Sequence, residues 1–384
     1  MNTQKQLVDI HHSGKPYIIY KSKKGFDLYT NFSKKIILNN KNVNSFLNKK
    51  YKSKKKETDL FIGFFGYELL NNLINIKIPN QKNINFPKGI FYKPEKKLKI
   101  NNKFNYKSQD EFKGSKFKIN INKNSYVRIF NQFKKKIKSG ETYQIKICTK
   151  YKTKSKINPL DFFSRLSETN LAPEAFMIRD KNYSIISCSP ENLITKEGSN
   201  ITTKPIAGTV KKTKGLNKIK ALNYFKKNLK ETKEHNMIVD MERNDLSRIC
   251  KVGSVKLHKQ KIVEEYKDLF HYVSLIKGKL KKNTKNIDII KAMMPGGSVI
   301  GCPKINTLNL LNNQEKENRN IYTGSFGYIK FNGDMRFNII IRSILNFKNV
   351  SEISVASGVV VDSNANHEFN ENYIKAKALI DLFK

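Results

Sequence analysis

The segment Val360–Lys375, VVDSNANHEFNENYIK, joins an apolar run to a predicted helix and carries two glutamates near its middle. The run that leads into it, Glu352–Val361, is rich in β-branched residues, which is typical of a strand. Asp362, Ser363 and Asn364 are helix start signals. Beyond them the apolar residues recur at steps of four, three, four and three, at Phe369, Tyr373, Ala376, Ile380 and Phe383. The segment therefore predicts a strand that leads into an amphipathic helix over residues 366–383.

Glu368 and Glu371 on this helix are three residues apart and so share one face. A second pair, Glu231 and Glu234, has the same spacing in a predicted helix over 217–243. Acid is scarce in this chain, which has 32 Asp+Glu against 74 Lys+Arg. Two such helices facing each other would offer four carboxylates to a hard divalent cation. For either pair alone, a solvated helix face is the alternative.

The charge and length of the chain set its class. With 384 residues, 38% of them hydrophobic, the chain is long enough for one large α/β domain or two ordinary domains. The formal charge of +42 raises the hypothesis of a nucleic-acid-binding protein. Only eight of the basic residues are Arg, however, and the lysines are spread along the whole length, so a compositional bias of the genome explains the charge better. The same charge helps to attract a dianionic substrate.

The cysteines and the first residues bear on location. Cys148, Cys188, Cys250 and Cys302 have neither zinc-site spacing nor a compact disulfide framework. The start, MNTQKQLVDIHHSGK, has no apolar signal region, and no run is long enough to span a bilayer. We therefore expect a soluble, unexported, cytoplasmic protein with reduced cysteines.

Strand-like and helix-like segments are mixed along the chain, which indicates an α/β or α+β protein. Strands are expected at Tyr17–Tyr20, Leu60–Phe65, Tyr143–Cys148, Ser184–Ser187, Gly324–Phe331, Asn338–Ile344 and Glu352–Val361. Helices are expected near 125–138, 217–243, 303–312 and 366–383. The polar stretch Asn101–Lys118 predicts a linker, which divides a weakly patterned N-terminal part, 1–118, from a better defined region, 119–384.

The glycine-rich loop Met294–Lys304 resembles a phosphate loop but fails the test. Cys302 and Pro303 stand where that motif requires Lys and Ser or Thr. Pro303 suits the first turn of a helix instead. The loop is thus either a carboxylate-binding turn at a helix N-terminus or a plain tight turn.

Four further features have both a functional and a structural interpretation. The turn Pro205–Thr209 offers Gly208 and Thr209 as donors to an anion. In Ser189-Pro190-Glu191 a lone carboxylate follows an apolar run, where a general acid or a surface glutamate could stand. His271, between apolar neighbours, is a pocket residue or a hydrogen-bonded core histidine. Arg342 closes an apolar run in a chain that nearly always uses Lys, which suggests bidentate carboxylate binding.

In this order, the segments resemble the chorismate-utilising enzymes: the large subunits (component I) of anthranilate synthase and aminodeoxychorismate synthase, with isochorismate and salicylate synthases as relatives. The resemblance covers roughly residues 120–384. It rests on Gly140–Gln144, Ser189–Glu191, Pro205–Thr209, Lys233–Leu246, Pro295–Lys304 and Val360–Lys375. It implies a chorismate-binding sandwich of large antiparallel sheets with helices on the outer faces. Residues 1–118 would be part of that sandwich and 119–384 its catalytic domain.

The resemblance also implies roles for individual residues. Glu231, Glu234, Glu368 and Glu371 match the acids around Mg²⁺, and Glu191 matches the general acid that protonates the departing C4 hydroxyl. His271 matches a catalytic pocket position. Positions that line the pocket or bind the substrate carboxylates correspond to Gly208, Thr209, Ser298, Tyr322, Arg342, Lys375, Ala356 and Gly358. Within the last group, Ala356-Ser357-Gly358 replaces the usual Gly-Ala-Gly.

Gln144 bears on the reaction. Relatives that add water at C2 carry a lysine base at this position, whereas the ammonia-using synthases carry glutamine, so the resemblance favours amination. The chain has no G-x-C-x-G nucleophile segment, and we expect ammonia to come from a separate glutamine amidotransferase subunit.

The product is predicted from two opposing signals. Ala207 stands where many aminodeoxychorismate synthases carry a lysine nucleophile, which favours anthranilate synthase. Gly296-Gly297-Ser298, Phe337-Asn338 and the lack of a Leu-Leu-Glu-Ser segment favour aminodeoxychorismate synthase, of folate and p-aminobenzoate synthesis. We prefer the latter and keep anthranilate synthase, of tryptophan synthesis, as the alternative.

Overall fold

The computed structural model describes residues 3–78, 86–101, 104–108, 113–266 and 269–384. The helices are α1 (Thr3–His12), α2 (Val43–Asn48), α3 (Tyr67–Leu73), α4 (Lys123–Lys138), α5 (Pro159–Asn170), α6 (Lys218–Lys227), α7 (Leu229–Ile249), α8 (Asn286–Met293), α9 (Lys304–Gln314) and α10 (Ala365–Ile380), with 3-10 turns η1 (Gly297–Val299) and η2 (Asp381–Phe383). The first strands are β1 (Tyr17–Ser22), β2 (Gly25–Ile37), β3 (Leu60–Phe65), β4 (Gly89–Ile100), β5 (Lys113–Gly114), β6 (Lys118–Ile119), β7 (Gln144–Lys156), β8 (Glu174–Arg179) and β9 (Tyr183–Ser189). The remaining strands are β10 (Asn192–Glu197), β11 (Asn200–Lys204), β12 (Ile206–Lys211), β13 (Lys256–Glu265), β14 (Leu269–Lys279), β15 (Gly301–Cys302), β16 (Ser325–Lys330), β17 (Met335–Asn338), β18 (Ser343–Phe347) and β19 (Val350–Val359).

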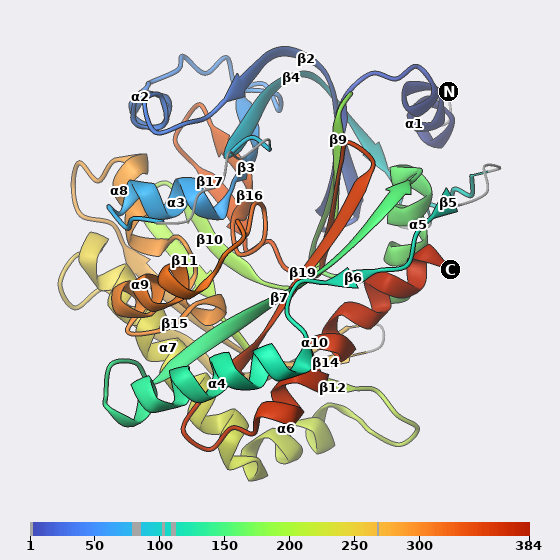
Figure 1. Cartoon of the computed structure of the whole chain (residues 1–384). Coiled ribbons are helices and arrows are strands. Elements are labelled where there is room, and N and C mark those ends of the chain that lie inside the picture. The colour runs from blue at the N-terminus through green and yellow to red at the C-terminus, as the bar shows by residue number, and fades with distance from the viewer. Residues whose placement is uncertain (1–2, 79–85, 102–103, 109–112, 267–268) are drawn as a thin grey trace.

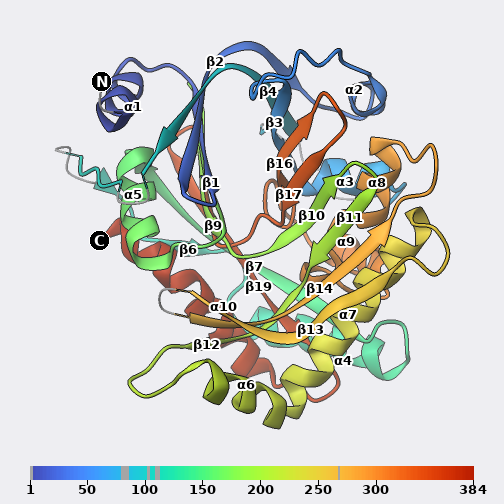
Figure 2. The ribbon, with the colours of Figure 1, turned by 180° about the vertical axis from the view of Figure 1, so that it is seen from behind.

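The strands form two large antiparallel sheets that are continuous with each other. The first sheet runs β7-β19-β18-β9-β8-β1-β2, and the second runs β3-β16-β17-β10-β11-β14-β13. Strand β4 pairs with β2 on one side and with β3 on the other, so it joins the two sheets. Figures 1 and 2 show the two sheets side by side, with the helices on their outer faces. The predicted antiparallel sandwich with outer helices is confirmed.

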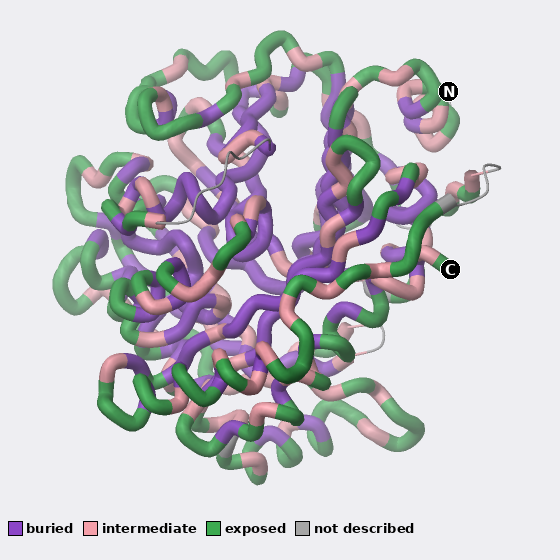
Figure 3. The backbone as a smooth tube through the Cα atoms, in the orientation of Figure 1, coloured by how far each residue is buried: buried purple, intermediate pink, exposed green. Residues whose placement is uncertain are grey.

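A buried core lies between the sheets and further cores lie under the helices. Between the sheets, the rings of Phe176 on β8 and Phe326 on β16 stack with centroids 3.7 Å apart. One outer core packs α1, α5 and α10 against the first sheet, and another packs α2, α3, α7 and α8 against the second. The strands are accordingly mostly buried, while exposed residues concentrate on helices and loops (Figure 3). Within the described ranges, no helix combines the length and apolar character that a membrane span requires.

Most predicted elements are found at their predicted places, and two are wrong. Asn338–Ile344 is not one strand, because β17 ends at Asn338 and β18 begins at Ser343, in the other sheet. Arg342, between them, has a left-handed φ of 51°, which a regular strand does not allow. The helix predicted over 217–243 is two helices, because Asn228 ends α6 and caps α7.

The linker predicted over Asn101–Lys118 lies partly outside the described residues. Its described C-terminal end forms the two short strands β5 and β6, both paired with β7. Division of the chain near residue 118 stays a prediction.

Candidate active site

Strand β7 carries two polar side chains, Gln144 and Lys146, toward one glutamate of α7. Residues two apart on a strand share a face, and both donate to the same atom. Gln144 Nε2 is 2.8 Å and Lys146 Nζ is 2.9 Å from Oε1 of Glu234. Pairing with two neighbouring strands fixes the position of this end of β7. Gln144 lies across from Cys302 on β15, and Lys146 lies across from Gly358 on β19. The ammonium of Lys146 lowers the pKa of Glu234 to about 2, so this carboxylate is ionised at neutral pH.

Gln144 has a buried acceptor that the described residues leave unused. The side chain is 1% exposed, and Oε1 has no hydrogen-bond partner among the described residues. The amide cannot simply be turned over, because a carboxylate requires the NH₂ group at its side. An unpaired buried acceptor is costly. The site therefore fits a ligand that brings an N–H or O–H donor to Gln144.

Helix α10 brings the second acidic pair together. Ligand atoms of His367, Glu368 and Glu371 all lie within 4.8 Å of one another. Glu368 is 1% exposed, and the Lys375 ammonium lies 2.7 Å from Glu371. Burial alone would raise the pKa of Glu371, but Lys375 beside it holds that pKa below its usual value. Lys375 also donates to the carbonyl of Ala356 at 3.0 Å, which ties α10 to β19.

The two acidic pairs are linked through cations. Lys146 acts electrostatically on both Glu234 and Glu371, and Lys375 acts on Glu371 and also on Glu234. Glu231 lies against the turn of β12, where a Cβ added at Gly208 would come within 2.9 Å of Glu231 Oε2. The His367–Glu368–Glu371 cluster contains neither glutamate of α7, so the four-carboxylate metal site stays a prediction. Its donors still fit the hard cation expected there, because carboxylate oxygens are the ligands that Mg²⁺ prefers.

Glu191 is buried directly after β9, where sequence reasoning left a surface position open. It is 5% exposed and accepts a hydrogen bond of 2.7 Å from Ser298 Oγ on η1. Burial raises the pKa of Glu191 to about 7. A carboxyl group with such a pKa can hold a proton near neutral pH and release it in a reaction.

His271 and Thr209 pair across β12 and β14. Their side chains meet at 2.8 Å between Oγ1 and Nδ1. His271 is 2% exposed, and burial lowers its pKa to about 4, so the ring is neutral at neutral pH. The preceding residue of the turn, Gly208, has a left-handed φ of 94°. The structure thus gives His271 the hydrogen bond expected of a core histidine and also places it in the wall of a cleft.

A cleft of about 590 Å³ opens beside His271 and Arg342. Its other lining residues are Thr169, Leu171, Ala172, Pro173, Lys211, Tyr266, Leu269, Ile374, Lys377, Ala378 and Asp381. The volume is in the range of small-molecule sites. Because Arg342, Lys211 and Lys377 bring three cations against the single acid Asp381, the cleft favours an anionic ligand.

Two of the predicted pocket positions, His271 and Arg342, line this cleft. The other predicted substrate positions do not: Gly208, Thr209, Ser298, Tyr322, Lys375, Ala356 and Gly358. Tyr322 and Ala356 pack with Cys148 in a small buried cluster. The phenol ring of Tyr322 lies 5.9 Å from the guanidinium of Arg319. Ala356 lies on β19 and Cys148 on β7, and contact of Tyr322 and Ala356 with a substrate stays a prediction.

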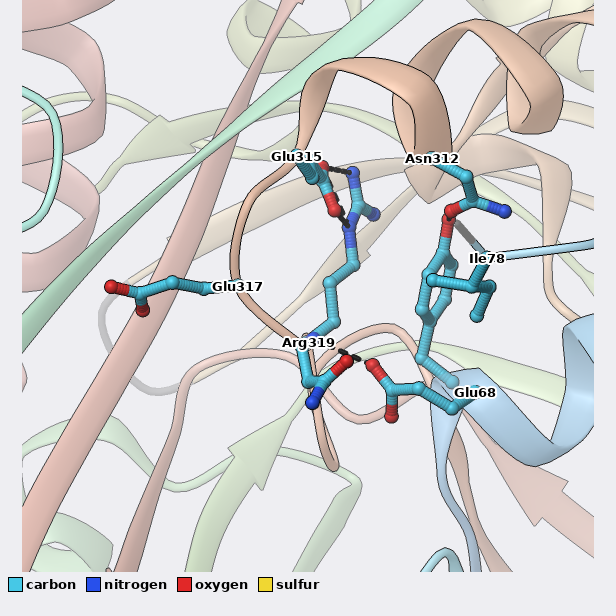
Figure 4. Close-up of a pocket in the computed structure, with 8 residues that line it drawn as sticks. Glu68, Ile78, Asn312, Glu315, Glu317 and Arg319 are labelled. Carbon is cyan, nitrogen blue, oxygen red and sulfur yellow. Dashed lines mark hydrogen bonds and ion pairs between the residues drawn. The ribbon is translucent and has the colours of Figure 1, made fainter. Parts of the chain in front are cut away.

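Sequence reasoning missed the group that holds β7 in place, Arg319. Its guanidinium is fully buried, forms three hydrogen bonds to Glu315 and donates to the carbonyl of Lys146 at 3.3 Å. The backbone N–H of Arg319 donates to Glu68 at 2.7 Å. Figure 4 shows Glu315 at the guanidinium end of Arg319 and Glu68 at its backbone. A cavity of only about 10 Å³ remains among these residues. The rarity of arginine, which singled out Arg342, would have singled out Arg319 as well.

Lys146 was missed too, although a signal was present. The alternation of β7 places Lys146 on the same face as Gln144, so a polar residue two positions after a site residue was a candidate from the start. Arg342 of the cleft acts electrostatically on the buried Glu191, which links the cleft to the acidic residues. Buried carboxylates near a cationic cleft are typical of an enzyme that acts on a small anionic substrate.

Comparison with known proteins agrees with that class. A profile of the family described as chorismate binding enzyme matches residues 13–381. Aminodeoxychorismate synthase component 1 of Bacillus subtilis is 34% identical over 264 residues, which cover 68% of this chain but only 56% of that protein. The anthranilate synthase component I-like protein of Synechocystis is 31% identical over 347 residues, covering 83% of this chain and 72% of that protein. The structure of anthranilate synthase component I from Streptococcus pneumoniae matches with a TM-score of 0.77 at 25% identity, over 96% of this chain and 92% of that one.

The chain belongs to the chorismate binding enzyme family, as its ordered motifs predicted.

Proposed function

We propose that this enzyme aminates chorismate with ammonia, in a Mg²⁺-dependent reaction, as component I of an aminodeoxychorismate synthase. The observation that carries the proposal is the environment of Gln144. Its Nε2 is engaged by Glu234, and its Oε1 is a buried acceptor without a partner among the described residues. Ammonia has the N–H donors that this oxygen lacks.

Glu191 is the proton donor in this proposal. Amination replaces the C4 hydroxyl of chorismate: a C–N bond forms, the C4–O bond breaks, and the proton held by Glu191 leaves with the oxygen as water. A pKa of about 7 suits this role, because about half of the Glu191 groups carry a proton at pH 7 and still give it up readily. The hydrogen bond from Ser298 fixes the carboxyl group for that transfer.

The cleft and the acidic pairs hold the substrate. Chorismate is a dianion, and Arg342 with Lys211 supplies positive charge in the cleft next to the neutral His271. Glu234, Glu368 and Glu371, with Glu231 nearby, would hold Mg²⁺, which when bound neutralises acid and fixes the ring carboxylate of the substrate. Gly208, Thr209, Lys375 and Gly358 are proposed as further substrate contacts.

Ammonia is proposed to come from a separate glutamine amidotransferase. The curated relatives named component 1 or component I support a two-component enzyme. In that case the isolated chain should act on added ammonium but not on glutamine.

Anthranilate synthase component I is the second candidate, and Ala207 favours it. Ala207 is 4% exposed and has no amine to offer a substrate, unlike the lysine of many aminodeoxychorismate synthases. The Gly296-Gly297-Ser298 turn argues against anthranilate synthase, because it resembles the aminodeoxychorismate branch. Ser298 of this turn donates the hydrogen bond to Glu191.

Product analysis tests both candidates. Purified protein is incubated with chorismate, Mg²⁺ and ammonium, and the products are separated and identified by mass. We expect 4-amino-4-deoxychorismate; fluorescent anthranilate would establish the second candidate. Folded protein that leaves chorismate unchanged, or converts it without incorporating nitrogen, would overturn the proposed amination. Repetition with glutamine in place of ammonium, with and without added amidotransferase, tests the partner.

A further inference from the structure

Lys146 forms an ion pair with Glu234, the carboxylate that the proposed metal ion would bind. Its ammonium lies 2.9 Å from Glu234 Oε1, the same oxygen that accepts from Gln144. Burial would lower the pKa of Lys146, but Glu234, Glu371 and Glu191 together hold it above its usual value, so the side chain is a cation. A positive charge therefore stands among the acids before any metal arrives.

The surroundings hold Lys146 in this place. Its carbonyl accepts from the buried guanidinium of Arg319 at 3.3 Å, and its backbone is paired with Gly358 of β19. Gly358 leaves the room that the ammonium fills, because a Cβ at that position would lie 2.9 Å from Lys146 Nζ. The carboxylates of Glu371 and Glu191 are within electrostatic reach of the same ammonium.

We propose that Lys146 is a tethered counter-cation of the acidic site, which neutralises Glu234 in the metal-free enzyme and competes with the divalent cation for that carboxylate. The inference rests on the proposed metal site. It goes beyond that proposal because it makes metal affinity a property of a lysine that none of the assigned roles includes. Oε1 of Gln144, next to the shared carboxylate, has no hydrogen-bond partner in the described part of the chain, which is independent support for a ligand at this end of β7.

Competition has a defined consequence. A metal ion that binds Glu234 must break the contact with Lys146 and then lie close to a positive charge, so the lysine weakens metal binding. The displaced ammonium remains tethered within reach of Glu371 and Glu191. The enzyme thus keeps its buried acids neutralised at low metal concentration and releases Glu234 only when metal is plentiful.

Direct metal binding tests the inference without any catalytic readout. Binding of Mn²⁺, as a stand-in for Mg²⁺, is measured by electron paramagnetic resonance on the 384-residue chain in the absence of chorismate. Lys146→Met should bind Mn²⁺ at least about tenfold more tightly than the parent protein, because close, partly buried charge pairs couple by 1.4 kcal/mol or more. Lys146→Gln, which keeps a donor to Glu234, should show the same direction, and Lys146→Arg should remain close to the parent.

Lys152→Met is the matched control. Lys152 is on the same strand and carries the same charge, but it is partly exposed and pairs with Glu317 and Glu352. Its removal should change Mn²⁺ affinity by less than about twofold, because exposed charges are screened. If Lys152→Met raised Mn²⁺ affinity as much as Lys146→Met does, the effect would come from net charge alone, and the inference would be overturned.

The outcomes also separate this inference from the proposed function. Equal or weaker Mn²⁺ binding by both Lys146→Met and Lys146→Gln, or no binding by any variant, overturns the competition. If the parent protein nevertheless aminates chorismate, the proposed function stands and only the role of Lys146 falls. If chorismate is not aminated but Lys146→Met binds Mn²⁺ more tightly, the proposed reaction falls and the competition stands.

Discussion

Ser298 Oγ donates a 2.7 Å hydrogen bond to Oε1 of Glu191, and both side chains are buried. The two residues come from segments more than a hundred positions apart, one after β9 and the other in η1. The glycine-rich loop that fails as a phosphate site therefore has another use. It sets the orientation of a carboxyl group and, by hydrogen bonding, counteracts part of the pKa rise that burial causes.

Glu191→Gln should abolish amination while leaving chorismate binding intact. Glutamine keeps the shape and the contact with Ser298 but cannot donate a proton to the C4 hydroxyl. We expect turnover to fall by at least about a hundredfold, the lower end of general acid catalysis. Turnover is followed by chorismate loss and binding by calorimetry. Glu197→Gln, on the exposed end of β10, is the matched control, and undiminished turnover in Glu191→Gln would refute the role.

The pH dependence should reveal the same group. Since the proton donor must be protonated, kcat/KM should fall about tenfold per pH unit once the pH exceeds the pKa of Glu191. That pKa is about 7 in the free enzyme. The free ammonia concentration must be held constant, because it rises with pH. Ser298→Ala removes a hydrogen bond that lowers this pKa and should shift the decline to higher pH. A decline that does not move would mean that another group titrates.

Gln144→Leu should impair the use of ammonia more than the binding of chorismate. Leucine has a similar volume but provides neither the Nε2 donor to Glu234 nor the free Oε1 acceptor. We expect kcat/KM for ammonia to fall at least about tenfold, the equivalent of one lost buried hydrogen bond. Ammonium is titrated at saturating chorismate. A variant with normal ammonia kinetics would contradict the proposed contact.

Gly358→Ala should disturb the site without unfolding the protein. The new Cβ would lie 2.9 Å from Gln144 Nε2 and 2.9 Å from Lys146 Nζ. Both atoms are ends of flexible side chains, so they can move at small cost to stability, but they would have to leave Glu234. We expect a similar melting temperature and much lower turnover. A parallel loss of both would point to a backbone change instead.

Glu68→Gln should make the protein less sensitive to alkaline pH. Burial raises the pKa of Glu68 to about 7, so the folded protein holds a proton that the unfolded chain releases above its lower pKa. This stabilising contribution is complete below pH 4.5 and is lost as pH rises toward 7. At pH 8 the variant should exceed the parent protein in free energy of unfolding by on the order of 2 kcal/mol.

Denaturant unfolding at pH 5 and pH 8 measures this difference. Glutamine can still accept from the backbone N–H of Arg319, the contact that Glu68 makes. Glu197→Gln serves again as the exposed control. A variant with the same pH slope as the parent protein would show that Glu68 is not the group responsible.

The sequence predicted the sandwich and the buried segments because periodicity and turn residues report local structure. It failed at Asn338–Ile344, since a short apolar run looks the same whether it is one strand or a buried crossing between two sheets. The break at Asn228 had a visible signal. Asparagine followed three residues later by Glu231 is a helix start, and the Asn228 side chain does accept from the backbone N–H of Glu231 at 3.2 Å.

The site was only partly predictable for a different reason. Glu191, Gln144 and Glu234 were found through motifs, but their mutual contacts depend on strand register between distant segments. Two such contacts are the ion pair of Lys146 with Glu234 and the hydrogen bond from Arg319 to the carbonyl of Lys146 on β7. Strand alternation made Lys146 a candidate, but no local pattern shows that its partner is Glu234.

The pairings of the N-terminal strands matter for how this protein is made. Strand β1 has its second neighbour in β8, and β3 has one in β16, close to the other end of the chain. During synthesis on the ribosome these strands emerge long before their partners, and their edges remain open meanwhile. Fragments that lack the C-terminal part would expose the edge of β3 permanently, and fragments that lack the N-terminal strands would expose the edges of β8 and β16. Expression of the whole chain, at low temperature or with chaperones, is therefore the practical route to material for every measurement above.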